Sequence, residues 1–133
     1  MLMQPYDIRS TIFQYWQDNY STTPTMYPNT EFPDSLKQSP FISLEIDFLK
    51  SQTRIASKQK SNRHRGYLTI SINVPRNSGN KTSYELAQEI IELFSGERVG
   101  GSISFDSAWV DKEEYREEHF TLVVLAPFRS TTS

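Results

Sequence analysis

The chain has 133 residues, a formal net charge of -2 and a pI near 5.7. This length fits one domain that buries roughly two-thirds of its unfolded surface, enough for one hydrophobic core. Charged residues at 23% and aromatic residues at 13% are typical of a folded protein and exclude a disordered chain. The absence of cysteine excludes disulfides and thiolate zinc sites. No apolar run approaches the ~20 residues that cross a bilayer, so we expect no membrane partner.

The first half of the chain predicts a helix, a short strand and a long hairpin. Residues 7–20 form an amphipathic helix behind a start signal at Pro5 and Asp7, with an apolar face of Ile8, Ile12, Tyr15 and Trp16. Residues 25–27 lie between two prolines and suit a short edge strand, and residues 29–40 suit a surface loop. Apolar and polar side chains alternate over 41–49 and again over 67–74, which is typical of half-buried strands.

The second half predicts one helix and two strands. Ser83 is the expected N-cap of a helix that ends at Ser95–Gly96, with an apolar face of Leu86, Ala87, Ile90, Leu93 and Phe94. Residues 98–105 and 119–128 are the expected strands, the first with a bulge or bend at Gly100–Gly101 and the two joined by an acidic connector, 111–118. The expected fold is therefore α+β. It is a single domain over 1–133 with its core in 6–128, a mainly antiparallel sheet of four to five strands, two packed helices and a long basic hairpin loop.

Charge is unevenly distributed along the sequence. Between Lys50 and Lys81 there are eight basic residues and no acidic one, whereas Glu85 to Glu118 contains ten acidic and three basic residues. A connection of about fifteen residues, 50–65, is long for a hairpin, and long loops in compact domains are mostly functional or disordered. The sequence predicts two regions of opposite charge through which copies or a polar partner associate.

Catalytic patterns are weak in this sequence. Two histidines, His64 and His119, would need carboxylates from across the fold to hold a metal. Glu45 and Asp47 share a strand face, as carboxylates of metal-dependent nucleases do, but no residue triplet completes a nuclease. The glycine pattern of a phosphate-binding loop is absent as well. We therefore expect no enzyme and no cofactor, with a nuclease using Glu45, Asp47 and His64 as the weakest alternative.

The basic 50–65 loop admits a nucleic-acid-binding module as the leading alternative. It has no aromatic residues for base stacking, and the pI of the chain is below that of most nucleic-acid modules. A solvated charged loop is the plain interpretation. Ile55 and Ala56 interrupt the charges, and the segment Arg63-His64-Arg65 enters a strand, which together favour a protein-facing role.

Several segments resemble the tail-terminator family of long-tailed bacteriophages. They are the helix from Ile8 to Trp16, the step Tyr27-Pro28-Asn29 with Phe32-Pro33, and a final strand ending in Ala126-Pro127-Phe128. The strongest is the strand that begins at Asn62-Arg63-His64-Arg65-Gly66 and ends at Pro75. The resemblance extends from Ile8 to Phe128, although the 51–61 loop is unusually rich in lysine.

This resemblance implies a structural virion protein, made in the host cytoplasm, that acts in the tail or neck. It would form a homo-hexameric ring on the head-proximal end of the tail tube, end tube polymerisation and provide the surface for head–tail joining. Implied partners are the tube protein and a head-completion or neck protein, with genomic DNA passing through the lumen without specific binding. Another head–tail connector protein is a further alternative. The expected interface residues are Arg54, Lys58, Lys60, Arg63, His64 and Arg65 on the basic side and Glu89, Glu92, Glu113, Glu114 and Glu117 on the acidic side.

Overall fold

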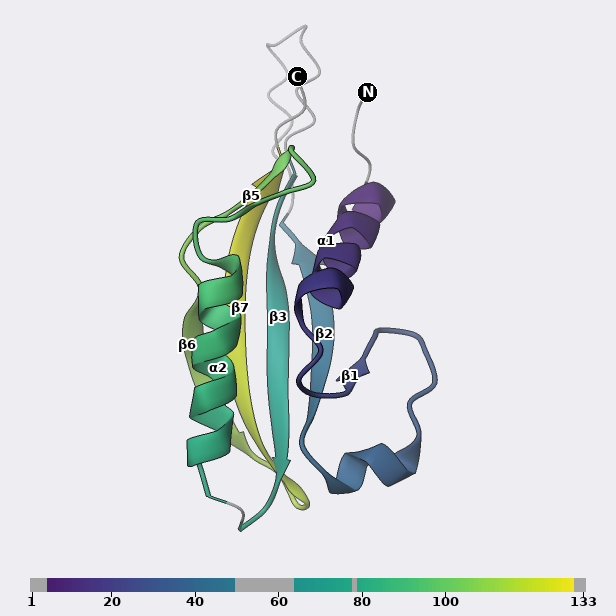
Figure 1. Cartoon of the computed structure of the whole chain (residues 1–133), viewed down its shortest axis with the longest axis vertical. Coiled ribbons are helices and arrows are strands. Elements are labelled where there is room, and N and C mark those ends of the chain that lie inside the picture. The colour runs from purple at the N-terminus through teal and green to yellow at the C-terminus, as the bar shows by residue number, and fades with distance from the viewer. Residues whose placement is uncertain (1–4, 50–63, 78, 131–133) are drawn as a thin grey trace, which may run out of the picture.

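The computed structural model describes residues 5–49, 64–77 and 79–130 (Figure 1). This part of the chain forms two α-helices, one 3-10 helix and seven strands in one sheet. In chain order they are α1 (Pro5–Asn19), β1 (Thr25–Met26), η1 (Asp34–Gln38), β2 (Phe41–Phe48), β3 (His64–Pro75), α2 (Lys81–Phe94), β4 (Arg98–Val99), β5 (Ile103–Phe105), β6 (Trp109–Tyr115) and β7 (His119–Ser130). The predicted α+β class is confirmed.

Two long antiparallel strands, β3 and β7, form the centre of the sheet. They pair without interruption from His64 opposite Ser130 to Pro75 opposite His119. The sheet order is β1-β2-β3-β7-β5-β4, and β6 also pairs with β7. All pairs are antiparallel except β1 with β2. We call the end where β3 begins the upper end and the end where β7 begins the lower end, as oriented in Figure 1.

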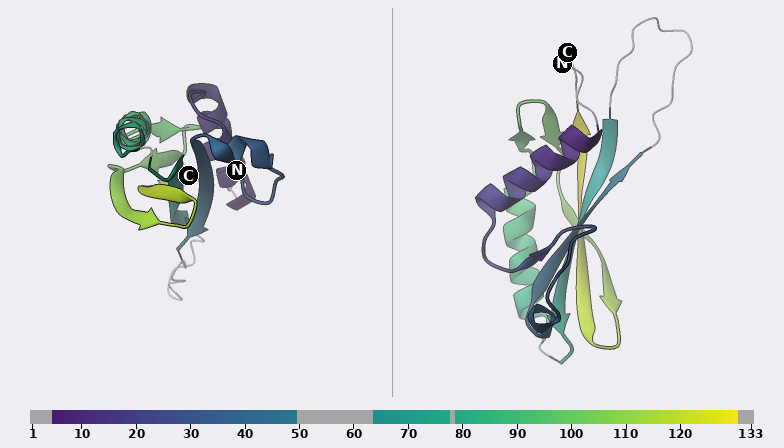
Figure 2. Two further views of the ribbon diagram at one scale, coloured as in Figure 1. Left: turned by 90° about the horizontal axis from the view of Figure 1, so that it is seen from below. Right: turned by 90° about the vertical axis from the view of Figure 1, so that its right-hand side faces the viewer.

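Both α-helices pack on the same face of the sheet, which we call the covered face (Figure 2). The predicted helix spacing holds, because α1 buries Ile8, Ile12 and Trp16 and α2 buries Leu86, Ala87, Ile90 and Phe94. The strands contribute alternate residues, as expected for period two, including Leu68, Ile70, Ile72 and Val74 of β3. The two helices meet where the Trp16 and Phe94 rings stack 6.1 Å apart.

The opposite face, which we call the open face, is covered at its lower end by the segment around η1. The Phe32 ring packs 5.3 Å from Phe41, and His119 Nε2 lies 2.8 Å from the Lys37 carbonyl oxygen. Residues 29–40, expected to be a loop, thus contain a 3-10 helix that is fixed to the sheet. Beneath it a buried polar pair joins two strands, because the Thr121 hydroxyl donates to the Asn73 side-chain oxygen at 2.7 Å.

The prediction of an acidic connector at 111–118 is wrong, because most of that segment belongs to strand β6. Trp109 and Val110 pair with Leu125 and Val124, and a bulge at Asp111 shifts the register before the pairing continues to Tyr115. Three charged residues follow the bulge. An edge strand accepts them because its outer side faces water, so acidic composition alone was a poor guide here.

Two further boundaries differ from the prediction. Residues 98–105 form two short strands, β4 and β5, joined by a turn in which Gly100 and Gly101 have φ of +62° and +78°. Ser83 is not the N-cap, because α2 begins at Lys81 and Asn80 precedes it. Seven strands are therefore present over the described residues where four to five were expected. The extra ones are short or carry charge, which weakens their periodic signal.

Candidate interaction surfaces

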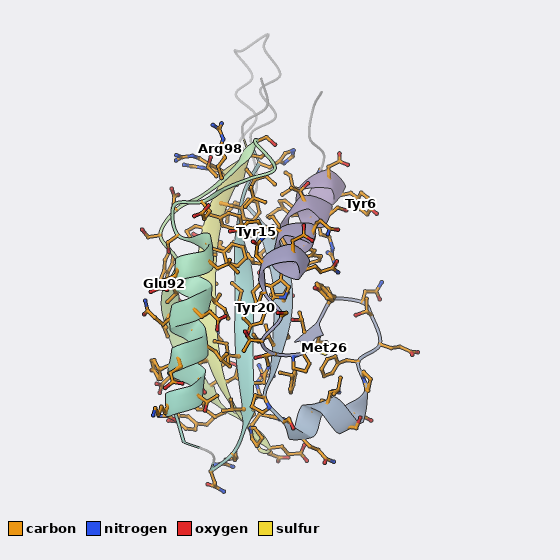
Figure 3. All side chains as sticks on the ribbon, in the orientation of Figure 1. Tyr6, Tyr15, Tyr20, Met26, Glu92 and Arg98 are labelled. Atoms are coloured by element: carbon orange, nitrogen blue, oxygen red, sulfur yellow. The ribbon has the colours of Figure 1, made fainter. Side chains whose placement is uncertain are left out.

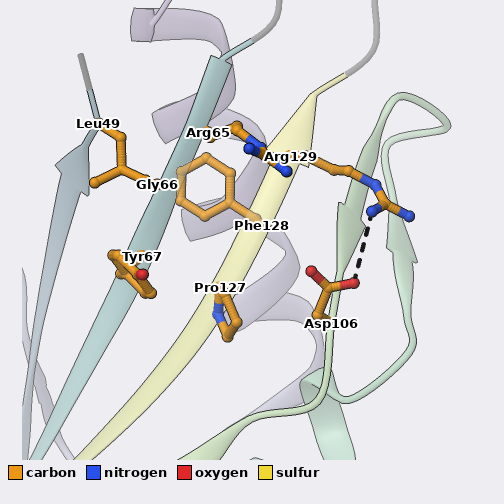
Figure 4. Close-up of a pocket in the computed structure, with 8 residues that line it drawn as sticks. All are labelled: Leu49, Arg65, Gly66, Tyr67, Asp106, Pro127, Phe128 and Arg129. Carbon is orange, nitrogen blue, oxygen red and sulfur yellow. Dashed lines mark ion pairs between the residues drawn. The ribbon is translucent and has the colours of Figure 1, made fainter. Parts of the chain in front are cut away.

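A pocket with a volume of about 250 Å³ lies at the upper end of the sheet (Figure 4). The open-face residues of β3 and β7 form its centre, because Arg65 pairs with Arg129 and Tyr67 pairs with Pro127. Paired residues point to the same face, so the two arginines project from the same face of the sheet as Tyr67 and Pro127. We call this site the arginine pocket; its lining residues are Leu49, Arg65, Gly66, Tyr67, Asp106, Pro127, Phe128 and Arg129.

The arginine pocket has an excess of positive charge. Arg129 forms an ion pair with Asp106, with 3.9 Å between nitrogen and oxygen, whereas Arg65 has no ion pair among the described residues. Like charges directly opposite each other destabilise an antiparallel pair. Two guanidinium groups and one carboxylate therefore leave this pocket suited to a further anion.

An apolar band continues from the arginine pocket across the open face. Tyr67 and Pro127 are cross-strand neighbours, Leu125 follows on the same face of β7, and Trp109 is paired with Leu125. Trp109 is 42% exposed, which is high for a residue of its size. This band has no covering helix among the described residues, and its β2 side carries the exposed carboxylates of Glu45 and Asp47.

At the lower end, exposed carboxylates and tyrosines form a second surface. We define the acidic end as Tyr84, Glu113, Tyr115, Glu117 and Glu118. The Tyr84 hydroxyl donates a hydrogen bond to the Glu113 carboxylate, and this hydrogen bond raises the pKa of Tyr84. Tyr115 is 68% exposed. The three carboxylates of this surface have no ion pair among the described residues, and they outnumber the Arg76 guanidinium that contacts the Glu117 backbone.

The predicted interface residues fall into distinct places. Arg54, Lys58, Lys60 and Arg63 lie outside the described residues. His64 and Arg65 point to opposite faces of the sheet, because alternation places His64 on the side of Leu68. Sequence neighbours in this strand therefore belong to different surfaces. Of the two predicted basic residues that the structure describes, His64 and Arg65, only Arg65 lines the arginine pocket.

The predicted acidic residues are also divided by the structure. On α2 the exposed Glu89 accepts a hydrogen bond from Thr22, and Glu92 accepts one from Gln88; Figure 3 shows Glu92 on the outer side of the helix. Glu114 points to the open face, opposite Thr121. Hydrogen bonds from Arg116 and Lys112 hold its pKa below the usual range. The negative charge of Glu114 is thus already compensated by two cations of its own subunit.

The catalytic alternatives find no support in these positions. Asp47 is paired with Tyr67 on the open face, whereas His64 lies on the covered face, so the proposed nuclease residues do not converge. His119 begins β7 and is paired with Pro75, at the far end from His64. Among the described residues there is no group of three histidine, aspartate or glutamate side chains that could hold a metal.

Three residues of the arginine pocket and apolar band, Arg129, Asp106 and Trp109, were not predicted from the sequence as interface residues. Arg129 follows the apolar run of the last strand, and its alternation with Pro127 and Leu125 already indicates the open face. Asp106 and Trp109 carry no such signal, because their contacts with β7 are distant in sequence. The Asp106 N–H donates to the Pro127 carbonyl oxygen, and Trp109 is paired with Leu125. Sheet topology was needed to bring these groups together.

This fold and these surfaces define a class of protein. It is a small α+β subunit with oppositely charged surfaces at its two ends. Residues 8–102 match the family described as phage tail terminator protein. The chain belongs to this family and is a structural protein of the phage tail. The resemblance predicted from its sequence is therefore confirmed at the level of the family.

The structural comparison extends beyond the region that matches the family. One solved structure superposes with a TM-score of 0.78 over 99% of each chain, at 16% sequence identity. The shared fold thus includes β6 and β7, which follow residue 102. No curated protein matches the sequence. Within residues 5–49, 64–77 and 79–130, neither helix has the length and apolar character required to cross a membrane.

Proposed function

We propose that this protein forms a six-membered ring on the head-proximal end of the tail tube and ends tube polymerisation there. The match of residues 8–102 to the terminator family carries the proposal. The same ring provides the surface to which a head-completion or neck protein joins, and genomic DNA passes through its lumen without specific binding. It is made in the host cytoplasm and becomes part of the tail and neck of the virion.

The separation of charge supports a closed ring. A ring of identical subunits uses heterologous contacts, so each subunit needs two unlike patches that complement each other. The arginine pocket and the acidic end are such a pair. The predicted basic residues of the 50–65 loop remain candidates for contact with a neighbour or with the tube.

The proposal is tested with the tail tube protein of the same phage. Purified tube protein is allowed to polymerise with and without an equimolar amount of this chain, and tube lengths are measured by electron microscopy. We expect shorter tubes with a ring at one end. Unchanged lengths and bare tube ends would refute the capping function.

A parallel measurement addresses the two alternatives. A nucleic-acid module would bind a short DNA duplex with an affinity that falls steeply as salt rises, in proportion to the phosphates contacted. Another connector protein would bind the head-completion protein but leave tube length unchanged. Either result would replace the terminator function with the corresponding alternative.

A further inference from the structure

We propose that the arginine pocket binds carboxylates of the acidic end of a second copy of this chain, so that copies associate head to tail. This inference rests on the ring in the proposed function and names the two surfaces that form its contact. Glu117 and Glu118 would supply the carboxylates. Arg65 and Arg129 would receive them, and the apolar band would contact Tyr115.

The chemistry of the pocket favours a protein carboxylate. A guanidinium group matches a carboxylate with two parallel hydrogen bonds, and Arg65 is free of any ion pair among the described residues. The apolar walls, including Tyr67 and Pro127, exclude water and so strengthen a charged contact. Asp106 inside the pocket and Asp47 beside it repel any anion. They limit the pocket to one or two carboxylates and disfavour the closely spaced phosphates of nucleic acid.

The acidic end has the complementary composition. Glu117 and Glu118 lie in the exposed turn between β6 and β7. The Arg76 guanidinium contacts the backbone carbonyl of Glu117, at 3.3 Å, and leaves the carboxylate available. The Tyr115 ring, which packs 5.1 Å from Phe120 at the same end of the sheet, is exposed and offers an apolar surface. The acidic end thus combines carboxylates with an aromatic ring, and the arginine pocket combines arginines with an apolar band. The two surfaces are therefore complementary in charge and in apolar character.

These surfaces cannot meet within one molecule. The acidic end adjoins Phe120 and the arginine pocket contains Arg129, nine residues further along the same continuous strand. At about 3.3 Å per residue the separation is roughly 30 Å. That exceeds the Debye length of about 8 Å at physiological ionic strength. Each subunit thus carries one unsatisfied cationic site and one unsatisfied anionic site, an arrangement that a head-to-tail contact satisfies.

Charge reversal tests this contact with two variants. Arg65→Glu makes the pocket negative, and Glu117→Arg with Glu118→Arg makes the acidic end positive. Both sets of side chains are exposed and outside the core, so the fold should persist, which circular dichroism checks. Matched controls are Arg98→Glu, an exposed arginine at the upper end but outside the pocket (Figure 3), and Glu31→Arg in the segment before η1.

Sedimentation velocity across a concentration series gives the association of each sample. We expect wild-type protein and both controls to form species larger than a dimer. Each reversal variant alone should associate at least tenfold more weakly, since close charge pairs across interfaces couple strongly. An equimolar mixture of the two variants should recover association, because a negative pocket then meets a positive end while the other two surfaces remain wild type. Such mixed species contain even numbers of subunits.

Each of the following outcomes would overturn the inference. They are a mixture that associates no better than its separate components, controls as impaired as the reversal variants, and recovered species that stop at two subunits. Wild-type protein that stays monomeric along with the mixture would also reject this contact. The tube-length assay is independent of this result: recovery by mixing without tube capping would reject the terminator function and leave the contact intact.

Discussion

Ser83 provides a test in which the sequence pattern and the structure predict effects of opposite sign. Its side chain is fully buried in the first turn of α2, and its hydroxyl has no hydrogen-bond partner among the described residues. A buried hydroxyl without a partner lowers the free energy of unfolding by about 1–3 kcal/mol. Serine also has a lower helix propensity than alanine, by roughly 0.5 kcal/mol.

Ser83→Ala removes the buried hydroxyl and adds a better helix former without changing the packed volume much. Some of the desolvation cost is relieved by small movements, so we expect the free energy of unfolding to rise by about 1–2 kcal/mol. For a domain of this size that corresponds to an increase in Tm of roughly 3–8 °C. Urea denaturation followed by circular dichroism gives the free energy, and a thermal scan gives the Tm.

The matched control is Ser95→Ala at the other end of the same helix. The Ser95 hydroxyl accepts a hydrogen bond from the Ala108 backbone N–H at 3.0 Å, so its loss should reduce stability by about 0.5–1.5 kcal/mol. If Ser83 were the N-cap, Ser83→Ala would instead destabilise the protein by about 0.5–2 kcal/mol. A loss of stability in Ser83→Ala would therefore refute the reasoning.

Three other predictions concern packing and pH. A Cβ at Gly66 would lie 2.3 Å from the Asp47 carbonyl oxygen, so Gly66→Ala should cost about 1–3 kcal/mol in urea denaturation; unchanged stability would contradict this close approach. Trp16→Phe removes the indole N–H that donates to the threonine hydroxyl of β1 at 2.9 Å and leaves a small cavity, so a loss of about 1–3 kcal/mol is expected. The hydrogen bond to Glu113 raises the pKa of Tyr84. Its stabilisation is present below the unfolded pKa of about 10 and is lost as the pH rises through the higher folded value. Tyr84→Phe should flatten that alkaline loss in a pH series, and an unaltered profile would count against it.

Long periodic segments were predictable from the sequence. The helix spacing of Ile8, Ile12 and Trp16 and the alternation from Leu68 to Val74 both match the buried residues of the structure. In each case one periodic pattern coincides with one face in contact with the core, so local sequence and tertiary packing agree.

The interaction surfaces were only partly predictable. Alternation from Leu68 already implies that His64 and Arg65 face opposite sides, but a run of basic letters suggests a single surface. The contact of Arg129 with Asp106 depends on β5 joining the far side of β7, and no local pattern encodes that pairing. Charged strand β6 was missed because its stability comes from cross-strand partners rather than from its own propensity.

The bulge and charges of β6 bear on how copies of this protein avoid uncontrolled growth. A long, flat and apolar edge would act as a template on which further chains add as strands. On β6 the bulge at Asp111 interrupts the line of free backbone groups, and Lys112 and Glu113 resist burial against a second strand. At the concentrations reached during virion assembly, this edge therefore opposes fibre-like stacking and directs association to side-chain surfaces. Strand β6 thus protects a subunit that is proposed to end tube polymerisation from polymerising itself by strand addition.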